Sequence, residues 1–127
     1  MQIIRGQQIP FTAASHEDPA DPGVLKRVLA THRHLMEGQV QMVNWSRMPA
    51  GRSFRRHLHE DMQEVFVILD GAVEMQVGDT SCRLQAGDAI LIDPMEAHQM
   101  SNPGPDTVNY LVFGISSGSG GRTIVCE

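Results

Sequence analysis

Two histidines and one glutamate near the middle of the chain have the side-chain types and the spacing that a metal ion requires. In an extended strand, residues two apart lie on the same face, so His57 and His59 point together. Glu64 follows His59 at an odd offset, which a straight strand would send to the opposite face. We therefore expect a turn over residues 60–63, after which Glu64 faces back toward the histidines. Imidazole nitrogens and a carboxylate suit first-row divalent metals.

The neighbouring residues are of the kind that hold such side chains on strands. Residues 65–69, VFVIL, form a short apolar, β-branched run that predicts a buried strand. Asp70-Gly71 is a strong signal for a hairpin turn directly after it.

These residues resemble the first signature of the cupin family. Its fixed positions are matched by Gly51, His57, His59, Glu64 and Gly71. The resemblance implies an all-β fold, a double-stranded β-helix of the cupin or jelly-roll-like type. It also implies one divalent metal ion, namely iron, manganese, nickel or zinc.

A stretch similar to the second cupin signature begins at Gly87 and places His98 and Asn102 at the family's spacings. The resemblance implies that His98 is the fourth metal ligand, beside His57, His59 and Glu64. The chain departs from the pattern at Asp93, which replaces a proline, and at Met95, which replaces a glycine. These departures concern the loop before His98 more than the ligand itself.

The rest of the chain also predicts an all-β fold. Short apolar or alternating segments recur between turn signals, which is typical of a sandwich or barrel. The expected strands cover residues 39–47, 72–77, 81–84, 89–92 and 108–113, with 89–92 expected to be buried. Residues 24–30 fit a helical turn or a strand equally well, and the resemblance favours a strand.

With 127 residues, the chain is expected to form a single cupin domain. We place the barrel core at about residues 40–114, an N-terminal arm at 1–39 and a C-terminal tail at 115–127. Residues 116–121, SSGSGG, have the composition of a linker. The final segment TIVC is expected to be an edge strand or a swapped tail.

Composition argues against several classes of partner. Ten Lys and Arg residues against fifteen Asp and Glu give a net charge of −5, the wrong sign for binding nucleic acid or anionic membranes. The start of the sequence lacks a secretory apolar core, so we expect a cytoplasmic protein. Cys82 and Cys126 fit no metal-binding pattern, and reduced thiols are expected.

The remaining histidines carry a weaker signal. His32 and His34 form a second pair two residues apart, but Gln39 stands where the acid would be. We expect both to be solvated. His16 lies in a polar, proline-containing part of the arm and gives no indication of a role.

Three residues are candidates for binding a substrate. Strand alternation continued back from His57 would turn Arg55 into the barrel, where its guanidinium would hold a carboxylate. Phe66 shares a face with Glu64, and Met100 follows His98 at the same parity. Met62, Met95 and Ile68 are further candidates for the pocket wall, while Gln63 and Tyr110 are polar candidates that parity does not place.

The expected function is that of a metal-binding cupin, an enzyme for a small carboxylic acid, polyol or sugar acid. The catalytic residues are not identified, and no organic cofactor is expected. A tetrahedral site with four protein ligands would be closed, whereas a six-coordinate ion would keep two positions open. The alternative is a non-catalytic module that binds a small ligand or metal. Open sheet edges and apolar outer faces predict a homodimer, with residues 24–30 covering a neighbour.

Overall fold

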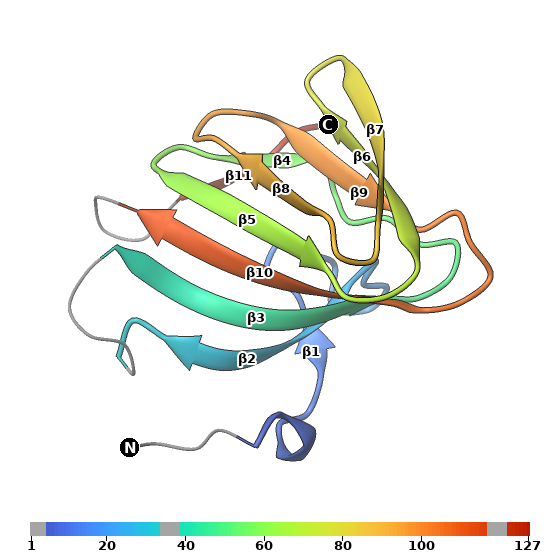
Figure 1. The fold of residues 1–127 in the computed structure, drawn as a ribbon. Helices are drawn as coiled ribbons and strands as arrows, with labels where there is room; N and C mark the ends of the chain where they lie inside the picture. The colour runs from blue at the N-terminus through green and yellow to red at the C-terminus, as the bar shows by residue number, and fades with distance from the viewer. Residues whose placement is uncertain (1–4, 34–38, 117–121) are drawn as a thin grey trace.

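The computed structural model describes residues 5–33, 39–116 and 122–127 and consists almost entirely of β-strands (Figure 1). One sheet has the strand order β1 (Thr12–Ala13), β2 (Leu25–Thr31), β3 (Val40–Met48), β10 (Val108–Ser116), β5 (Met62–Ile68) and β8 (Ala89–Ile92). The other has the order β11 (Thr123–Val125), β4 (His57–His59), β9 (His98–Ser101), β6 (Ala72–Val77) and β7 (Thr80–Gln85). A short 3-10 helix, η1, covers Gly6–Gln8. No helix in the described part of the chain is long and apolar enough to span a membrane.

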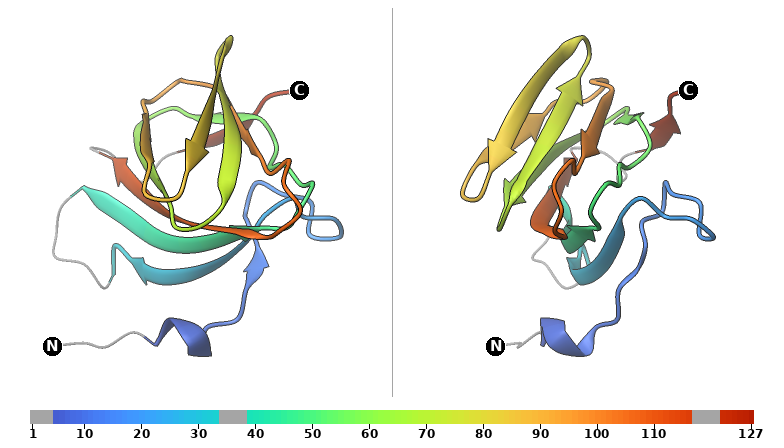
Figure 2. Two further views of the ribbon diagram at one scale, coloured as in Figure 1. Left: turned by 45° about the vertical axis from the view of Figure 1, so that its right-hand side comes forward. Right: turned by 90° about the vertical axis from the view of Figure 1, so that its right-hand side faces the viewer.

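The two sheets face each other and enclose the core (Figure 2). All of their strand pairings are antiparallel. Alternating residues point inward, as in β5, where Phe66 and Ile68 are buried and Val65 and Val67 are half-buried. The all-β, double-stranded β-helix prediction is therefore confirmed.

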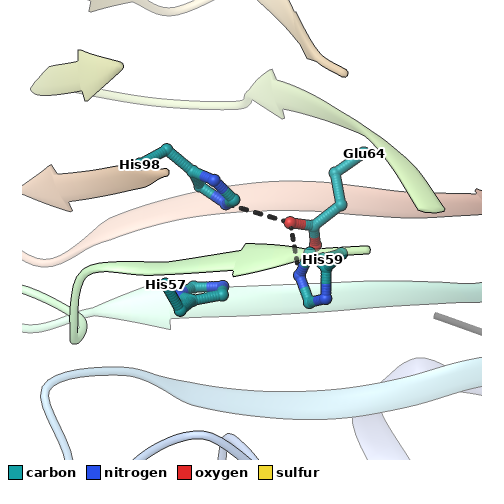
Figure 3. A group of neighbouring side chains, drawn as sticks. All are labelled: His57, His59, Glu64 and His98. Carbon is teal, nitrogen blue, oxygen red and sulfur yellow. Dashed lines mark hydrogen bonds and ion pairs between the residues drawn. The ribbon is translucent and has the colours of Figure 1, made fainter. Parts of the chain in front are cut away.

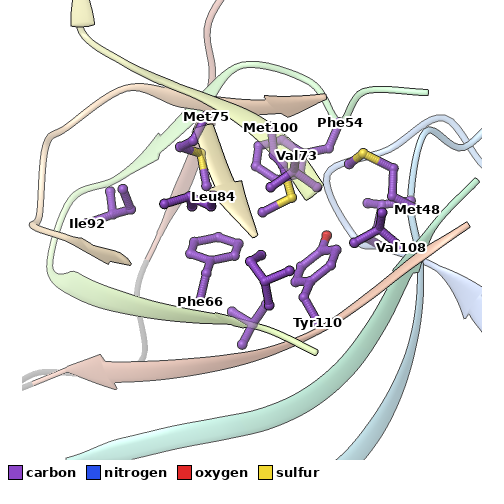
Figure 4. Packing of buried hydrophobic residues seen from close by; sticks show 14 residues of the cluster. Met48, Phe54, Phe66, Val73, Met75, Leu84, Ile92, Met100, Val108 and Tyr110 are labelled. Carbon is purple, nitrogen blue, oxygen red and sulfur yellow. The ribbon is translucent and has the colours of Figure 1, made fainter. Parts of the chain in front are cut away.

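The apolar core lies between the two sheets (Figure 4). Met48 and Tyr110 contribute large side chains from the six-stranded sheet, and Met75 and Met100 contribute from the five-stranded sheet. All four are almost fully buried. Burial of such side chains stabilises the fold by roughly 1.5–3 kcal/mol each relative to exposure.

One strand differs from its prediction. Residues 89–92 do form β8, but Leu91 is 60% exposed and Ala89 is also exposed, while Ile92 is buried. β8 is the edge strand of its sheet, so the outward-facing side chains have no neighbouring strand on one side. A short apolar run alone does not distinguish an edge strand from a fully buried one.

The arm and the tail both contribute strands. Residues 25–31 form β2, as the family resemblance favours, and β2 pairs with β3 of the same chain. β11 pairs with β4 as an edge strand, with Ile124 opposite Leu58. His34 and residues 117–121 of the expected linker lie outside the described residues.

Asn102, from the second signature, organises a loop. Its side-chain amide donates hydrogen bonds to the carbonyls of Met48 and Asp106, at 3.0 and 2.7 Å. Its backbone carbonyl accepts the N–H of Gly51, which has a φ of +74°. Asn102 thereby fixes the turn that leads into the first signature. Cys82 and Cys126 are free thiols, as expected.

Candidate metal centre

Strand β4 presents two of the candidate ligands. His57 and His59 are both buried while Leu58 between them is half-buried, so the predicted alternation is confirmed over these three residues. The turn that follows is shorter than expected, because β5 already begins at Met62. Glu64 points inward from β5, and its side chain is buried.

The fourth candidate, His98, begins strand β9 and is fully buried. Its Cα atom pairs with that of His57 across the sheet. The loop before it is held by Met95, whose N–H donates to the carbonyl of His59 at 2.7 Å. Met95 has a φ of +71°, so the position where the cupin pattern has glycine does adopt the left-handed conformation that glycine favours.

The four side chains converge on one point (Figure 3). One donor atom from each of His57, His59, Glu64 and His98 lies within 4.8 Å of the others. Ligands bound to one ion at about 2.1 Å stand at most about 4.2 Å apart. The largest separation between these donor atoms is therefore within about an ångström of the separation that one bound ion allows.

The outer nitrogens of the histidines are fixed by hydrogen bonds. The Nδ1–H groups of His57 and His98 donate to the carbonyls of Arg55 and Glu96, at 2.6 and 2.9 Å. Nδ1 of His59 lies 3.0 Å from the hydroxyl of Thr123 on β11. A carbonyl can only accept, so Nε2 of His57 and His98 is left with its lone pair toward the site, as in metal-ligating histidines.

This arrangement brings the carboxylate oxygen of Glu64 close to imidazole nitrogens that face the site. Glu64 Oε1 lies 2.9 Å from Nε2 of His59 and 3.0 Å from Nε2 of His98. The His59 nitrogen has no hydrogen-bond partner of suitable geometry among the described residues. Acceptors this close require a shared cation, which is a proton or a metal ion. Three imidazoles and a carboxylate fit a first-row divalent metal.

The surroundings of His57 and Glu64 keep both side chains in protonation states that bind metal. Burial lowers the pKa of His57 to about 4, so this imidazole is neutral at pH 7. Burial alone would raise the pKa of Glu64, but the imidazoles of His59 and His98 beside it lower that pKa to about 2. Neutral imidazole and ionised carboxylate are the forms that coordinate a metal ion.

A cavity of about 330 Å³ lies beside the four residues. Its walls include His57, His59 and Glu64, whereas His98 is fully buried and does not line it. Most other lining residues come from the arm and from β2, β3, β5 and β10. They are Ala14, Ser15, His16, Val24, Lys26, His32, Gln41, Met42, Asn44, Ser46, Phe54, Met62, Phe66, Tyr110, Val112 and Thr123.

Of the three candidate substrate-binding residues, only one lines the cavity. Phe66 lines the cavity, whereas Met100 is buried in the core and does not line it. Arg55 is exposed and outside the cavity, so its predicted inward orientation is wrong. Strand β4 begins only at His57, and the irregular segment before it breaks the alternation and buries Phe54 instead.

Of the further residues that the sequence suggested for the pocket, some line the cavity and others do not. Met62 and Tyr110 line the cavity, whereas Ile68 packs in the core. Met95 is 62% exposed, so its expected place in the pocket wall is wrong. Gln63 is turned away and donates to Asp93 at 3.0 Å.

His16 is a site residue that the sequence did not indicate. Its ring stacks on that of His57, with centroids 4.1 Å apart, and its Nε2 is buried without a hydrogen-bond partner among the described residues. Burial, followed by the proximity of His57, lowers the pKa of His16 to about 3. A lone histidine in an irregular arm carries no periodic signal that would have revealed this.

The arm reaches the site because Glu17 anchors it. The buried carboxylate accepts the backbone N–H of Gly23 at 2.7 Å and that of Arg55 at 2.8 Å. A Cβ atom at Gly23 would stand 1.7 Å from the carbonyl oxygen of Ser53, so only glycine allows this approach. Glu17 therefore joins the arm to the segment that precedes His57.

Lys26 and Asn44 also line the cavity, as does the exposed His32. None of them lies in a signature segment. Sequence analysis did not single out Lys26 or Asn44, although Lys26 is the single lysine of the chain.

Comparison with known proteins decides the family. A sequence model of the cupin domain, Cupin_2, matches residues 44–114, more than half of the chain. The protein is a small, single-domain cupin. Among curated proteins, the uncharacterized protein MJ1618 of Methanocaldococcus jannaschii is 26% identical to this cupin over 84 residues. That match covers 66% of each chain, so the cupin spans about two thirds of the relative's length.

Solved structures share the fold of this cupin at low sequence identity. A predicted oxalate decarboxylase from Thermotoga maritima has a TM-score of 0.80 and 23% identity, covering 91% of this chain and 99% of its own. The polyketide cyclase RemF from Streptomyces resistomycificus has a TM-score of 0.78 and 16% identity, covering 100% and 87%. A sugar phosphate isomerase from Silicibacter pomeroyi has a TM-score of 0.76 and 19% identity, covering 99% and 82%. These matches establish the fold alone.

Proposed function

We propose that this cupin is a metal-dependent enzyme for a small oxygen-bearing substrate, such as a carboxylic acid, polyol or sugar acid. His57, His59, Glu64 and His98 hold one divalent ion, which is iron, manganese, nickel or zinc. The observation that carries the proposal is that three of these residues form the wall of a cavity of about 330 Å³. A substrate in the cavity therefore stands next to the ion.

The cavity favours an open metal site over a closed, structural one. The four side chains approach from strands β4, β5 and β9, so the side facing the cavity is left to water or a ligand. A bound divalent ion supplies Lewis-acid polarisation of substrate oxygens or a position for oxygen. Phe66 and Met62 line the same space and keep water away from the bound substrate.

One observation favours the alternative, a non-catalytic binding module. Burial lowers the pKa of His16 to about 3, and burial raises the pKa of Tyr110 well above its ordinary value. Both groups are therefore neutral at pH 7 and are poorly matched to proton transfer there. A binding module needs only their hydrogen bonds.

Cobalt substitution tests the proposed site. We expect the cobalt(II) protein to show the weak visible absorption of a six-coordinate ion, changing when a hydroxy acid such as malate is added. Strong four-coordinate absorption that malate leaves unchanged would contradict an open site. Oxygen uptake and solvent-deuterium exchange into small acids then separate the two functions, because a binding module binds these acids without turnover.

We propose that the cupin forms a homodimer through the outer face of the six-stranded sheet. Val43, Phe113, Val65 and Leu91 form a continuous apolar row across β3, β10, β5 and β8 on that face. Leu91 is 60% exposed and the other three are half-buried, so a second copy would cover them. Light scattering should give twice the 14.0 kDa chain mass, and Leu91→Glu should shift it toward 14.0 kDa. A wild-type mass of 14.0 kDa would refute the dimer.

A further inference from the structure

Lys26 is the single lysine of the chain, and it is half-buried on the cavity wall. Strand β2 alternates, so the next side chain, Arg27, lies on the outer face, where its guanidinium stacks over Phe11 and Trp45. Lys26 forms no ion pair with any described residue, and burial lowers its pKa. A half-buried ammonium group without a counter-ion has lost hydration and gained no partner. An anionic ligand would supply one.

Asn44 carries an unpaired acceptor on the same wall. Its side chain is almost fully buried, at 7% exposure, and its Oδ1 has no hydrogen-bond partner among the described residues. Lys26 pairs with Ser46 across β2 and β3, one inward-facing position along β3 from Asn44. An unpaired buried acceptor costs about 1–3 kcal/mol. A ligand hydroxyl that donates to it would remove that cost.

These two residues stand away from the metal ligands. In the sheet order β2-β3-β10-β5, Lys26 and Glu64 lie three strand spacings apart, which is about 14 Å across the strands. The residue of β5 in line with Lys26 is Ile68, so Glu64 is offset by a further four residues along its strand. The lysine side chain covers part of this distance, and the ligand must cover the remainder. A two-carbon acid chelated at the metal centre is therefore too short to reach Lys26.

We propose that Lys26 and Asn44 form a second anchoring site for the far end of a ligand held at the metal centre. The ligand class is a hydroxylated diacid of about six carbons, given C–C bonds of about 1.5 Å. One carboxylate with its neighbouring hydroxyl chelates the metal, the other carboxylate binds Lys26, and a hydroxyl in between donates to Asn44. This assignment rests on the proposed metal-dependent function.

Calorimetry on the full, manganese-loaded protein tests the second site with two probes, D-glucarate and oxalate. We expect Lys26→Met to weaken D-glucarate binding by about tenfold to hundredfold, because a charge-assisted contact is lost. Asn44→Leu should weaken it by about tenfold. Oxalate binding should change by less than twofold in both variants. Arg83→Met removes the same charge from an exposed position on β7, outside this cavity, and should change neither probe.

A second measurement reports on Lys26 directly. Reductive ¹³C-methylation labels only this lysine and the amino terminus, so its NMR signal is readily assigned. D-glucarate should shift the Lys26 signal, and oxalate should not. Equal D-glucarate affinity in Lys26→Met and wild type, with no shift, would overturn the second site while metal-dependent oxalate binding upheld the proposed function. Loss of metal binding altogether would instead overturn the proposed function itself.

Discussion

The imidazole of His16 stacks on that of His57, with ring centroids 4.1 Å apart and planes 26° from parallel. The stack joins the N-terminal arm to a candidate metal ligand. Burial lowers the pKa of both imidazoles, to about 3 for His16 and about 4 for His57. Both are neutral in the folded protein at pH values where they are charged in the unfolded chain.

This relationship predicts how the stability of the metal-free protein depends on pH. Between about pH 4 and 6.5, the unfolded chain binds protons on His16 and His57 that the folded protein does not. The free energy of unfolding therefore does not depend on these two groups above about pH 6.5. It decreases as the pH falls from 6.5 toward 4, by up to about 2.7 kcal/mol per pH unit. His16→Phe, which keeps an aromatic ring, should reduce the slope by up to about 1.4 kcal/mol per unit. Urea unfolding with chelator at pH 4.5, 5.5 and 6.5 measures it, and an unchanged slope would count against the buried neutral pair.

Glu17 should be essential for docking the arm. Glu17→Ala leaves the buried N–H groups of Gly23 and Arg55 without their acceptor, so we expect a loss of about 2–4 kcal/mol in the free energy of unfolding. Glu17→Gln keeps one carbonyl oxygen and should lose roughly half as much. Urea denaturation measures both variants. An alanine variant as stable as wild type would mean that the arm does not depend on this carboxylate.

Thr123 should tune the metal affinity from the C-terminal tail. Its hydroxyl lies 3.0 Å from Nδ1 of His59 and helps to orient that ring. Loss of such a partner typically lowers metal affinity 10- to 100-fold. Thr123→Val should therefore weaken metal binding by about tenfold, while Thr123→Ser should stay near wild type. Competition with a chromophoric chelator gives the affinities, and equal values for all three proteins would remove the role of Thr123.

Met95 holds a strained backbone conformation. Its φ of +71° is unfavourable for any residue with a Cβ atom. Its side chain is 62% exposed, so little packing depends on it. Met95→Gly should raise the free energy of unfolding by about 0.5–1 kcal/mol, the strain relief less the added chain entropy. Met95→Ala keeps the Cβ and should give no such gain. Thermal unfolding of the two variants checks this, and equal stability changes would show that φ is not the cause.

The sequence predicted the parts of the site that depend on local periodicity. His57 and His59 share a face because a strand alternates, and Glu64 returns to them because a turn intervenes. The same rule failed for Arg55, since alternation holds only inside a strand and β4 begins at His57. A different rule failed for Leu91: a short apolar run predicted a buried strand, but β8 lies at the edge of its sheet and its outward-facing side chains are exposed.

The remaining site residues could not be predicted from local sequence. His16 and Thr123 reach the site through the docking of an arm by Glu17 and the pairing of β11 with β4. Both are tertiary contacts between segments far apart in the chain. Lys26 lies outside both signature segments, so neither motif spacing nor strand alternation pointed to it.

Metal content tests the central claim, that four buried side chains hold one divalent ion. Protein made without a histidine tag or added metal would be measured by plasma mass spectrometry, beside His57→Ala and the exposed-site control His32→Ala. We expect about one equivalent of iron, manganese, nickel or zinc in the wild type and the control, and little in His57→Ala. No metal in the wild type, or the same content in His57→Ala, would contradict the claim.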